Sequence, residues 1–105
     1  MIMHIVTFSW NQRTSNDEVA ALSDALEAFA PVVPGLRDYR HGPALATGRG
    51  NADYAIAAVF DGVEDVHAYL DHPEHHRIVR EIVTPMLGQR QAVQIAVTDG
   101  KEPHG

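Results

Sequence analysis

The chain has 105 residues, 45% of them hydrophobic, and a formal net charge of −6 at pH 7. This length fits one domain with a single modest core, and the acidic balance argues against nucleic acid as a partner, because nucleic-acid binding depends on Lys and Arg meeting phosphate. Without cysteine, the chain has no disulfides and no thiolate nucleophile.

The sequence also argues against a membrane partner. No apolar run approaches the roughly 20 residues that a membrane helix needs. The opening Met1-Ile2-Met3-His4 lacks the basic region and the small-residue cleavage site of a signal peptide. We therefore expect a cytoplasmic protein.

Residues 1–10 alternate as a strand does, and both of its faces are largely apolar. One face holds Ile2, His4, Val6, Phe8 and Trp10, and the other holds Met3, Ile5, Thr7 and Ser9. A strand with two apolar faces is covered on both sides. A single layer of helices cannot provide that cover, so a second layer or a second subunit is indicated.

A helix is predicted to follow residues 11–14. Ser15-x-x-Glu18 has the spacing of a capping box, in which each side chain bonds the other residue's backbone N–H. The apolar stripe of this helix is Val19, Leu22, Leu26 and Phe29. Pro31 ends it.

Two strands and a long connection are predicted next. Pro34-Gly35 indicates a turn into a strand at 36–41. Residues 42–53 lack periodicity and indicate a loop, and the nearly continuous apolar run at 54–60 is typical of a central strand.

The second helical region is predicted to have two parts. Asp61-x-x-Glu64 has capping spacing and opens a helix that ends near Asp71, because Pro73 disfavours helical geometry at the residue before it. A new helix begins with Pro73 and ends at residues 84–85, which makes His72 the residue at the joint.

The last strand is predicted at 92–98, with a flexible polar tail at 99–105. The order β-α-β-β-α-β predicts an α+β, ferredoxin-like fold, with a four-stranded antiparallel sheet and both helices on one face. The other sheet face would leave a large apolar patch. We therefore expect a homodimer whose two sheets pack face to face, a dimeric α+β barrel.

Residues 69–76 concentrate one phenol and three imidazoles. His75 lies on the apolar stripe of the second helix, while His76 lies about 100° around it and faces water. Partial burial would keep the His75 imidazole neutral and able to accept a proton, which Tyr69 could complement as a proton donor. A structural role for His75, as a buried polar tie to Tyr69 or His4, remains the alternative.

A metal site is the weaker interpretation of this cluster. His72 and His75 are three residues apart, but Pro73 places His72 outside the helical register. We expect neither a metal nor a cofactor. For His72 the simpler role is to cap the helix that begins at Pro73.

The chain resembles the stress-responsive A/B barrel family, dimeric α+β barrel proteins abbreviated Dabb, over nearly its full length. The residues that carry the resemblance are His4-Ile5-Val6-Thr7-Phe8, Val33-Pro34-Gly35-Leu36, Phe60 and Tyr69-x-x-His72-Pro73-x-His75. The last motif is the most specific. The resemblance implies one Dabb domain over residues 1–105.

Most members of this family have no assigned reaction, but a plant polyketide cyclase branch closes a poly-β-keto chain by aldol condensation. Tyr69 and His75 match its catalytic pair, and His4 matches a histidine of its pocket. Two positions depart from the branch: Leu26 stands where it has a pocket tyrosine, and Val97 where it has a carboxylate.

Two functions follow as expectations. One is a cofactor-free cyclase-like lyase or isomerase acting on a β-keto small molecule, with His75 as base and Tyr69 as proton donor. Its pocket would be lined by His4, Val6, Phe8, Leu26 and His72. The other is a stress-related dimer or small-ligand-binding module without chemistry.

Overall fold

The structure is a computed structural model that describes residues 1–45 and 50–98. The tail expected at 99–105 and part of the predicted 42–53 loop lie outside the described residues. Described helices and strands, in chain order, are β1 (Ile2–Trp10), α1 (Asn16–Phe29), a 3₁₀ turn (Ala30–Val32), β2 (Leu36–Pro43), β3 (Tyr54–Phe60), α2 (Val63–Asp71), α3 (Pro73–Ile78), a π-helical turn (Val79–Val83), α4 (Thr84–Met86) and β4 (Leu87–Ala96).

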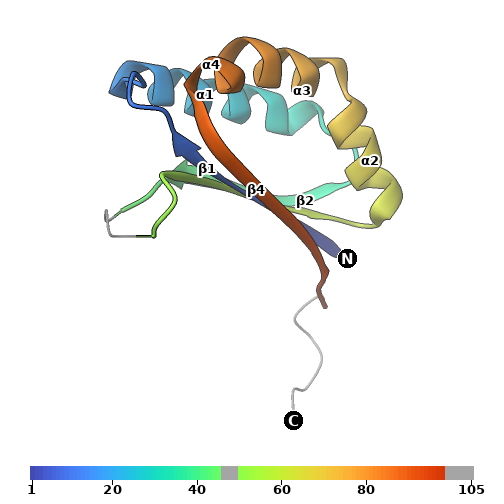
Figure 1. Ribbon diagram of the computed structural model, residues 1–105. Coiled ribbons are helices and arrows are strands. Elements are labelled where there is room, and N and C mark those ends of the chain that lie inside the picture. The colour runs from blue at the N-terminus through green and yellow to red at the C-terminus, as the bar shows by residue number, and fades with distance from the viewer. Residues whose placement is uncertain (46–49, 99–105) are drawn as a thin grey trace.

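The four strands form one antiparallel sheet in the order β2-β3-β1-β4, so the two central strands are β3 and β1. All the helices lie on one face of this sheet, and the opposite face is open (Figure 1). The predicted α+β, ferredoxin-like arrangement is therefore confirmed. None of the described helices is long and apolar enough to cross a membrane.

The start of α1 is the predicted capping box. The Ser15 hydroxyl accepts a hydrogen bond from the Glu18 N–H at 3.2 Å, and the Glu18 carboxylate accepts one from the Ser15 N–H at 3.0 Å. The predicted cap at Asp61 is wrong. Gly62 precedes α2 without a side-chain cap, and the Asp61 carboxylate instead accepts a hydrogen bond from Arg37 Nε at 2.5 Å.

Chain direction reverses at Gly35, as the Pro34-Gly35 pair indicated. Gly35 has φ +74°, a left-handed conformation that favours glycine. A Cβ there would lie 2.3 Å from the Asp65 carboxyl carbon, so the side chain of α2 occupies the space that glycine leaves.

The break between α2 and α3 lies where the sequence placed it. His72 has extended backbone, and its Nδ1 accepts a hydrogen bond from the Glu74 N–H at 3.0 Å, which caps α3. The helical region continues to Met86, slightly beyond the predicted end. It loosens into the π-helical turn, where the Thr84 backbone N–H and hydroxyl both donate to the Val79 carbonyl.

The last strand differs most from its prediction. β4 begins at Leu87, five residues before the predicted start, and ends at Ala96. Its pairs with β1 run from Trp10↔Leu87 to Ile2↔Ala96. Because β1 is itself long, it offers hydrogen-bonding partners along the whole of β4, including the polar half that has no apolar alternation.

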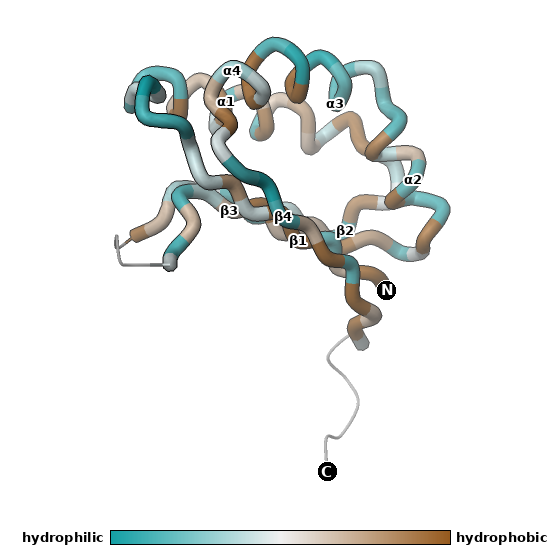
Figure 2. Tube along the Cα trace, viewed as in Figure 1, coloured by the Kyte–Doolittle hydropathy of each residue, from teal (hydrophilic) through white to brown (hydrophobic). Residues whose placement is uncertain are grey.

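The helix-facing side of the sheet carries the core. Its buried residues are Val6, Phe8, Leu22, Leu26, Phe29, Val33, Tyr54, Ile56, Ala58, Phe60, Val66, Tyr69, Ile78 and Val83. Figure 2 shows hydrophobic residues along β1 and the lower part of β4, with hydrophilic residues along much of α3. The core thus lies between the sheet and one helical layer.

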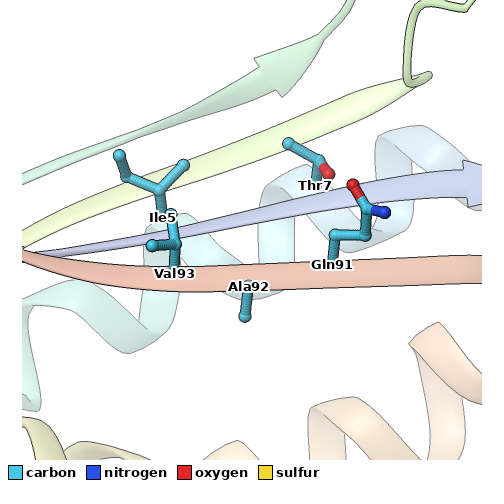
Figure 3. A pocket seen from close by; sticks show the side chains of 5 residues that line it. All are labelled: Ile5, Thr7, Gln91, Ala92 and Val93. Carbon is cyan, nitrogen blue, oxygen red and sulfur yellow. The ribbon is translucent and has the colours of Figure 1, made fainter.

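The open face of the sheet is also apolar. In Figure 3, Ile5 of β1 and Val93 of β4 point to the same side beside Thr7 and Gln91, while Ala92 points to the other side. Val93 is 51% exposed and Ile95 44% exposed. Two β-branched side chains on an edge strand are therefore left in contact with solvent in a single chain.

Candidate functional site

A largely enclosed cavity of about 70 Å³ lies between the sheet and the helices. Strands β1, β3 and β4 form its floor, and α1, α2, α3 and the π-helical turn form its walls. Its lining residues are His4, Val6, Phe8, Leu26, Phe29, Ile56, Tyr69, His75, Ile78, Val79, Val83, Leu87 and Arg90. The lining is apolar except for two histidines, one tyrosine and one arginine.

Tyr69 reaches the cavity from the last turn of α2 and is 2% exposed. Its ring lies between aromatic neighbours, with ring centroids 5.6 Å from Phe29 and 5.2 Å from Phe60. Its hydroxyl is 3.0 Å from the Tyr39 hydroxyl of β2. Packing and this hydrogen bond together fix the position of the phenol.

His75 lies two residues after Pro73, on the face of α3 that meets Tyr69. The two rings are edge to face with centroids 4.8 Å apart. The buried Nδ1 of His75 forms no well-aligned hydrogen bond with any described residue. The contact of the ring with the Leu70 backbone is the smallest influence on its pKa, so the ring has little polar interaction to lose when it binds a ligand.

His4 completes the polar part of the cavity from β1 and is 1% exposed. Its Nδ1 contacts the side-chain amide of Gln94, its cross-strand neighbour on β4. With the amide nitrogen as donor, the neutral His4 ring carries its proton on Nε2. The His4 and Tyr69 ring centroids are 6.1 Å apart.

Burial keeps these groups uncharged. It lowers the pKa of His75 to about 4, helped by the nearby His76, His4 and Arg90 and opposed by the Leu70 backbone. Burial, and then the charge of Arg90, lowers the pKa of His4. Burial also raises the pKa of Tyr69, against a smaller opposing effect of its hydrogen bond to Tyr39. At neutral pH the site holds two neutral imidazoles and a neutral phenol.

Six of the seven residues expected at the site lie around this cavity: His4, Val6, Phe8, Leu26, Tyr69 and His75. His72 was expected to line it and does not. Its Nδ1 is used in capping α3, and its ring packs against Phe29 with centroids 5.0 Å apart. Capping turns the His72 ring toward the helix joint and leaves His75 as the imidazole of this segment in the cavity.

The sequence did not indicate Arg90 or Tyr39 as site residues. Arg90 lies in the half of β4 that was taken for a connection, although the length of β1 called for a longer partner strand. Tyr39 lies in the strand predicted at 36–41, where core and rim packing was favoured over a place at a pocket mouth. Its hydrogen bond to Tyr69 crosses from β2 to α2, a contact that sequence periodicity does not reveal.

The described residues contain no group of three or more His, Asp or Glu side chains arranged to hold a metal ion. What the cavity offers is a small, mostly apolar space beside one imidazole with an unbonded nitrogen and one phenol. Such a pair can accept a proton at one point and donate a hydrogen bond at another.

Comparison with known proteins identifies structures of similar fold. A dimeric ferredoxin-like protein of unknown function from Thermobifida fusca is 38% identical, with a TM-score of 0.84 over 91% of this chain and 90% of that one. A dimeric protein of unknown function and ferredoxin-like fold from Bacteroides fragilis is 24% identical, with a TM-score of 0.78 over 91% of this chain and 95% of that one.

A third similar structure is the hydroxynitrile lyase from Passiflora edulis. It is 14% identical, with a TM-score of 0.77 over 93% of this chain and 88% of that one, a likeness of fold. No curated protein matches the chain. The family model of the stress responsive A/B barrel domain matches residues 2–97. This protein therefore belongs to the stress responsive A/B barrel domain family.

Proposed function

We propose that this protein is a cofactor-free lyase or isomerase that moves a proton on a small β-keto compound, with His75 as base and Tyr69 as proton donor. The observation that carries the proposal is the neutral His75 imidazole at a cavity wall, with its ring centroid 4.8 Å from that of Tyr69. Its buried Nδ1 forms no well-aligned hydrogen bond with a described residue. The hydroxynitrile lyase of the same fold is a precedent for small-molecule chemistry on this scaffold.

The step begins at the ligand carbon between two carbonyl groups. His75 takes the proton from this carbon, the C–H bond breaks, and its electron pair forms an enolate. The enolate oxygen accepts a hydrogen bond from the Tyr69 phenol. For Tyr69 to donate to the ligand, Tyr39 must be the donor in the bond between the two hydroxyls, which are 3.0 Å apart.

Two properties of the site narrow the substrate. An imidazole with a pKa of about 4 is a weak base, so it requires a carbon acidified by two carbonyl groups. A cavity of about 70 Å³ is roughly half the size of one that takes benzene, so it admits a short fragment and not a long poly-β-keto chain. The apolar Leu26, where the cyclase branch has a tyrosine, fits the same restriction.

The proposal includes a homodimer formed through the open sheet face. Val93 and Ile95 are about half exposed there, beside the partly buried Met3 and Ile5. Packing this face on that of a second copy would bury these side chains and remove an apolar patch. The similar proteins from Thermobifida fusca and Bacteroides fragilis are described as dimeric.

The experiment measures deuterium exchange at the methylene carbon of acetylacetone in D₂O, above a buffer blank. Wild-type protein should accelerate exchange, and His75→Ala and Tyr69→Phe should each reduce the acceleration at least ~10²-fold, the usual scale of general acid–base help. Light scattering on the same samples should give a dimer mass. His67→Ala is the matched control, because His67 is exposed, does not line the cavity and does not act on the pKa of His75.

Exchange at the same rate in His75→Ala as in wild type would exclude the catalytic role. The second candidate is a dimer that binds a small ligand without chemistry. It is favoured by the hydrogen bond that already engages the Tyr69 hydroxyl. Saturable binding of acetylacetone without accelerated exchange would support this candidate.

A further inference from the structure

The rim of the cavity carries one arginine that the proposed reaction does not use. Arg90 lies on β4 opposite Phe8, on the side of the strand that faces the helices. It lines the cavity with His4 and His75, yet it is an exposed residue while His4 is 1% exposed. Arg90 therefore marks the side on which the cavity meets solvent.

Among the described residues Arg90 has no carboxylate partner, although the chain is acidic with a net charge of −6. Four other arginines form ion pairs with carboxylates: Arg37, Arg40, Arg77 and Arg80. Within residues 1–45 and 50–98, Arg90 forms neither an ion pair nor a hydrogen bond. A guanidinium offers several N–H donors in a planar fork that matches a carboxylate, and these donors are unused here.

The positive charge of Arg90 also acts on both imidazoles of the cavity. It contributes to the lowered pKa of His4 and, less strongly, of His75. None of the described residues that line the cavity is a carboxylate that could offset it. The polar end of the cavity is thus positive in a protein that is negative overall, which favours an anion at the rim.

We propose that the ligand of this cavity is a short β-keto acid whose carboxylate pairs with Arg90 at the rim while its keto end enters toward His75 and Tyr69. This inference rests on the proposed function and names its substrate class. Pairing with Arg90 offsets the negative charge of the carboxylate, which would otherwise make the carbon between the two carbonyl groups less acidic. Cavity size agrees with it, because only the uncharged fragment of three or four heavy atoms would enter a volume of about 70 Å³.

The test compares two probes of equal heavy-atom number, acetoacetate and acetylacetone, which differ by one charge. Calorimetric titration at pH 7 should show that wild-type protein binds acetoacetate at least about 10-fold more tightly. Arg90→Gln should weaken acetoacetate binding about 10- to 100-fold, the range for a lost charged hydrogen-bond pair, and leave acetylacetone binding within about twofold. Arg90→Lys should retain part of the preference.

Arg13→Gln is the matched control, because it removes the same charge from an exposed arginine that does not line the cavity. It should leave the affinity for both probes unchanged. Equal or undetectable binding of the two probes to wild-type protein would overturn the proposal. Equal losses in Arg90→Gln and Arg13→Gln would also overturn it, because they would indicate attraction by net charge alone.

The pKa values of His4 and His75 give a second test of the carboxylate site. A carboxylate beside Arg90 offsets the charge that disfavours protonated His4 and His75, so acetoacetate binding should raise the pKa of both imidazoles, measured by NMR titration. Because binding requires no turnover, the two proposals fail separately. Arg90-dependent selectivity without accelerated exchange leaves the carboxylate site intact and removes the reaction. If acetylacetone exchange depends on His75 but acetoacetate binds no more tightly than acetylacetone, the reaction is supported and the carboxylate site is excluded.

Discussion

Two groups of polar side chains lie under the helices on the same sheet face, and their hydrogen bonding differs. In the first, which we call the Tyr54 network (Ser23, Glu27, His41 and Tyr54), the Tyr54 hydroxyl is 2.8 Å from Ser23 Oγ and 2.9 Å from His41 Nδ1. His41 Nε2 lies 2.9 Å from a Glu27 carboxylate oxygen. The Tyr54 hydroxyl thus has two hydrogen-bond partners, and the His41 ring has one at Nδ1 and a charged contact, without a well-aligned hydrogen bond, at Nε2.

The second group, the His75 cluster (His4, Tyr69 and His75), is incomplete. The His75 ring packs against the ring of Tyr69 and contacts the Leu70 backbone, and a cavity adjoins it. Its Nδ1 forms no well-aligned hydrogen bond with any described residue. Buried polar groups in folded proteins are as a rule hydrogen-bonded, and the exceptions call for an explanation. Our explanation is that the Tyr54 network holds the fold together and the His75 cluster is completed by a ligand.

Tyr54→Phe should have the largest effect among the variants that test this distinction between a structural and a functional group. Removing the hydroxyl leaves buried His41 Nδ1 and Ser23 Oγ without their partner, so the free energy of unfolding should fall by about 2–3 kcal/mol. Exchange of acetylacetone should stay within about twofold of wild type. Urea unfolding and the exchange assay check the two halves of this prediction.

Ser23→Ala should reduce the stability less than Tyr54→Phe does. It removes one partner of Tyr54 from the helix surface and leaves the His41 bond in place, so its cost should be about 1 kcal/mol or less. If Tyr54→Phe slowed exchange as strongly as Tyr69→Phe does, the two groups would form one functional unit and the comparison would be wrong.

Sequence patterning predicted the layers and the order of helices and strands along the chain, and the family resemblance indicated much of the cavity wall. Burial periodicity placed His75 inward and His76 outward, and Pro73 placed the helix break, because both depend on local geometry. The Ser15 cap could be predicted for the same reason, because its two partners are three residues apart. Local rules sufficed wherever a side chain's role depended on its neighbours along the chain.

The remaining features depend on contacts between distant segments. The polar first half of β4 is a strand because β1 lies beside it, which is how Arg90 comes to the cavity. His41 and Tyr54 meet because β2 pairs with β3. In the same way, Asp61 pairs with Arg37 across the sheet instead of capping α2. Such pairings are set by the fold and leave no periodic trace in the sequence.

Acid should destabilise the protein through the His75 cluster. The folded-state pKa of His75, about 4, lies below the ordinary histidine value of 6.5, so between these values the unfolded chain binds more protons. Stability is therefore unaffected above pH 6.5 and is lost as pH falls toward 4. A shift of this size corresponds to about 3 kcal/mol, and solvent at the partly exposed ring reduces the expected loss to about 1–2 kcal/mol.

His75→Gln isolates this contribution, because glutamine does not titrate. Between pH 7 and pH 4.5, the unfolding free energy of wild type should fall by about 1 kcal/mol or more beyond that of the variant. Parallel pH dependences for the two proteins would mean that the His75 ring is solvated in the folded state, and the distinction between the two groups would lose its electrostatic basis.

Tyr39→Phe addresses the boundary between the two groups and should have the smallest effect. The Tyr39 hydroxyl is 3.0 Å from that of Tyr69, and its ring centroid is 5.5 Å from that of His41. If Tyr39 donates to Tyr69 and so directs the Tyr69 proton toward the ligand, its loss should slow exchange about three- to tenfold. Because Tyr39 would act only through Tyr69, the double variant Tyr39→Phe/Tyr69→Phe should be no slower than Tyr69→Phe alone. Additive losses would instead indicate that Tyr39 contacts the ligand itself, which would extend the site from the cavity toward β2.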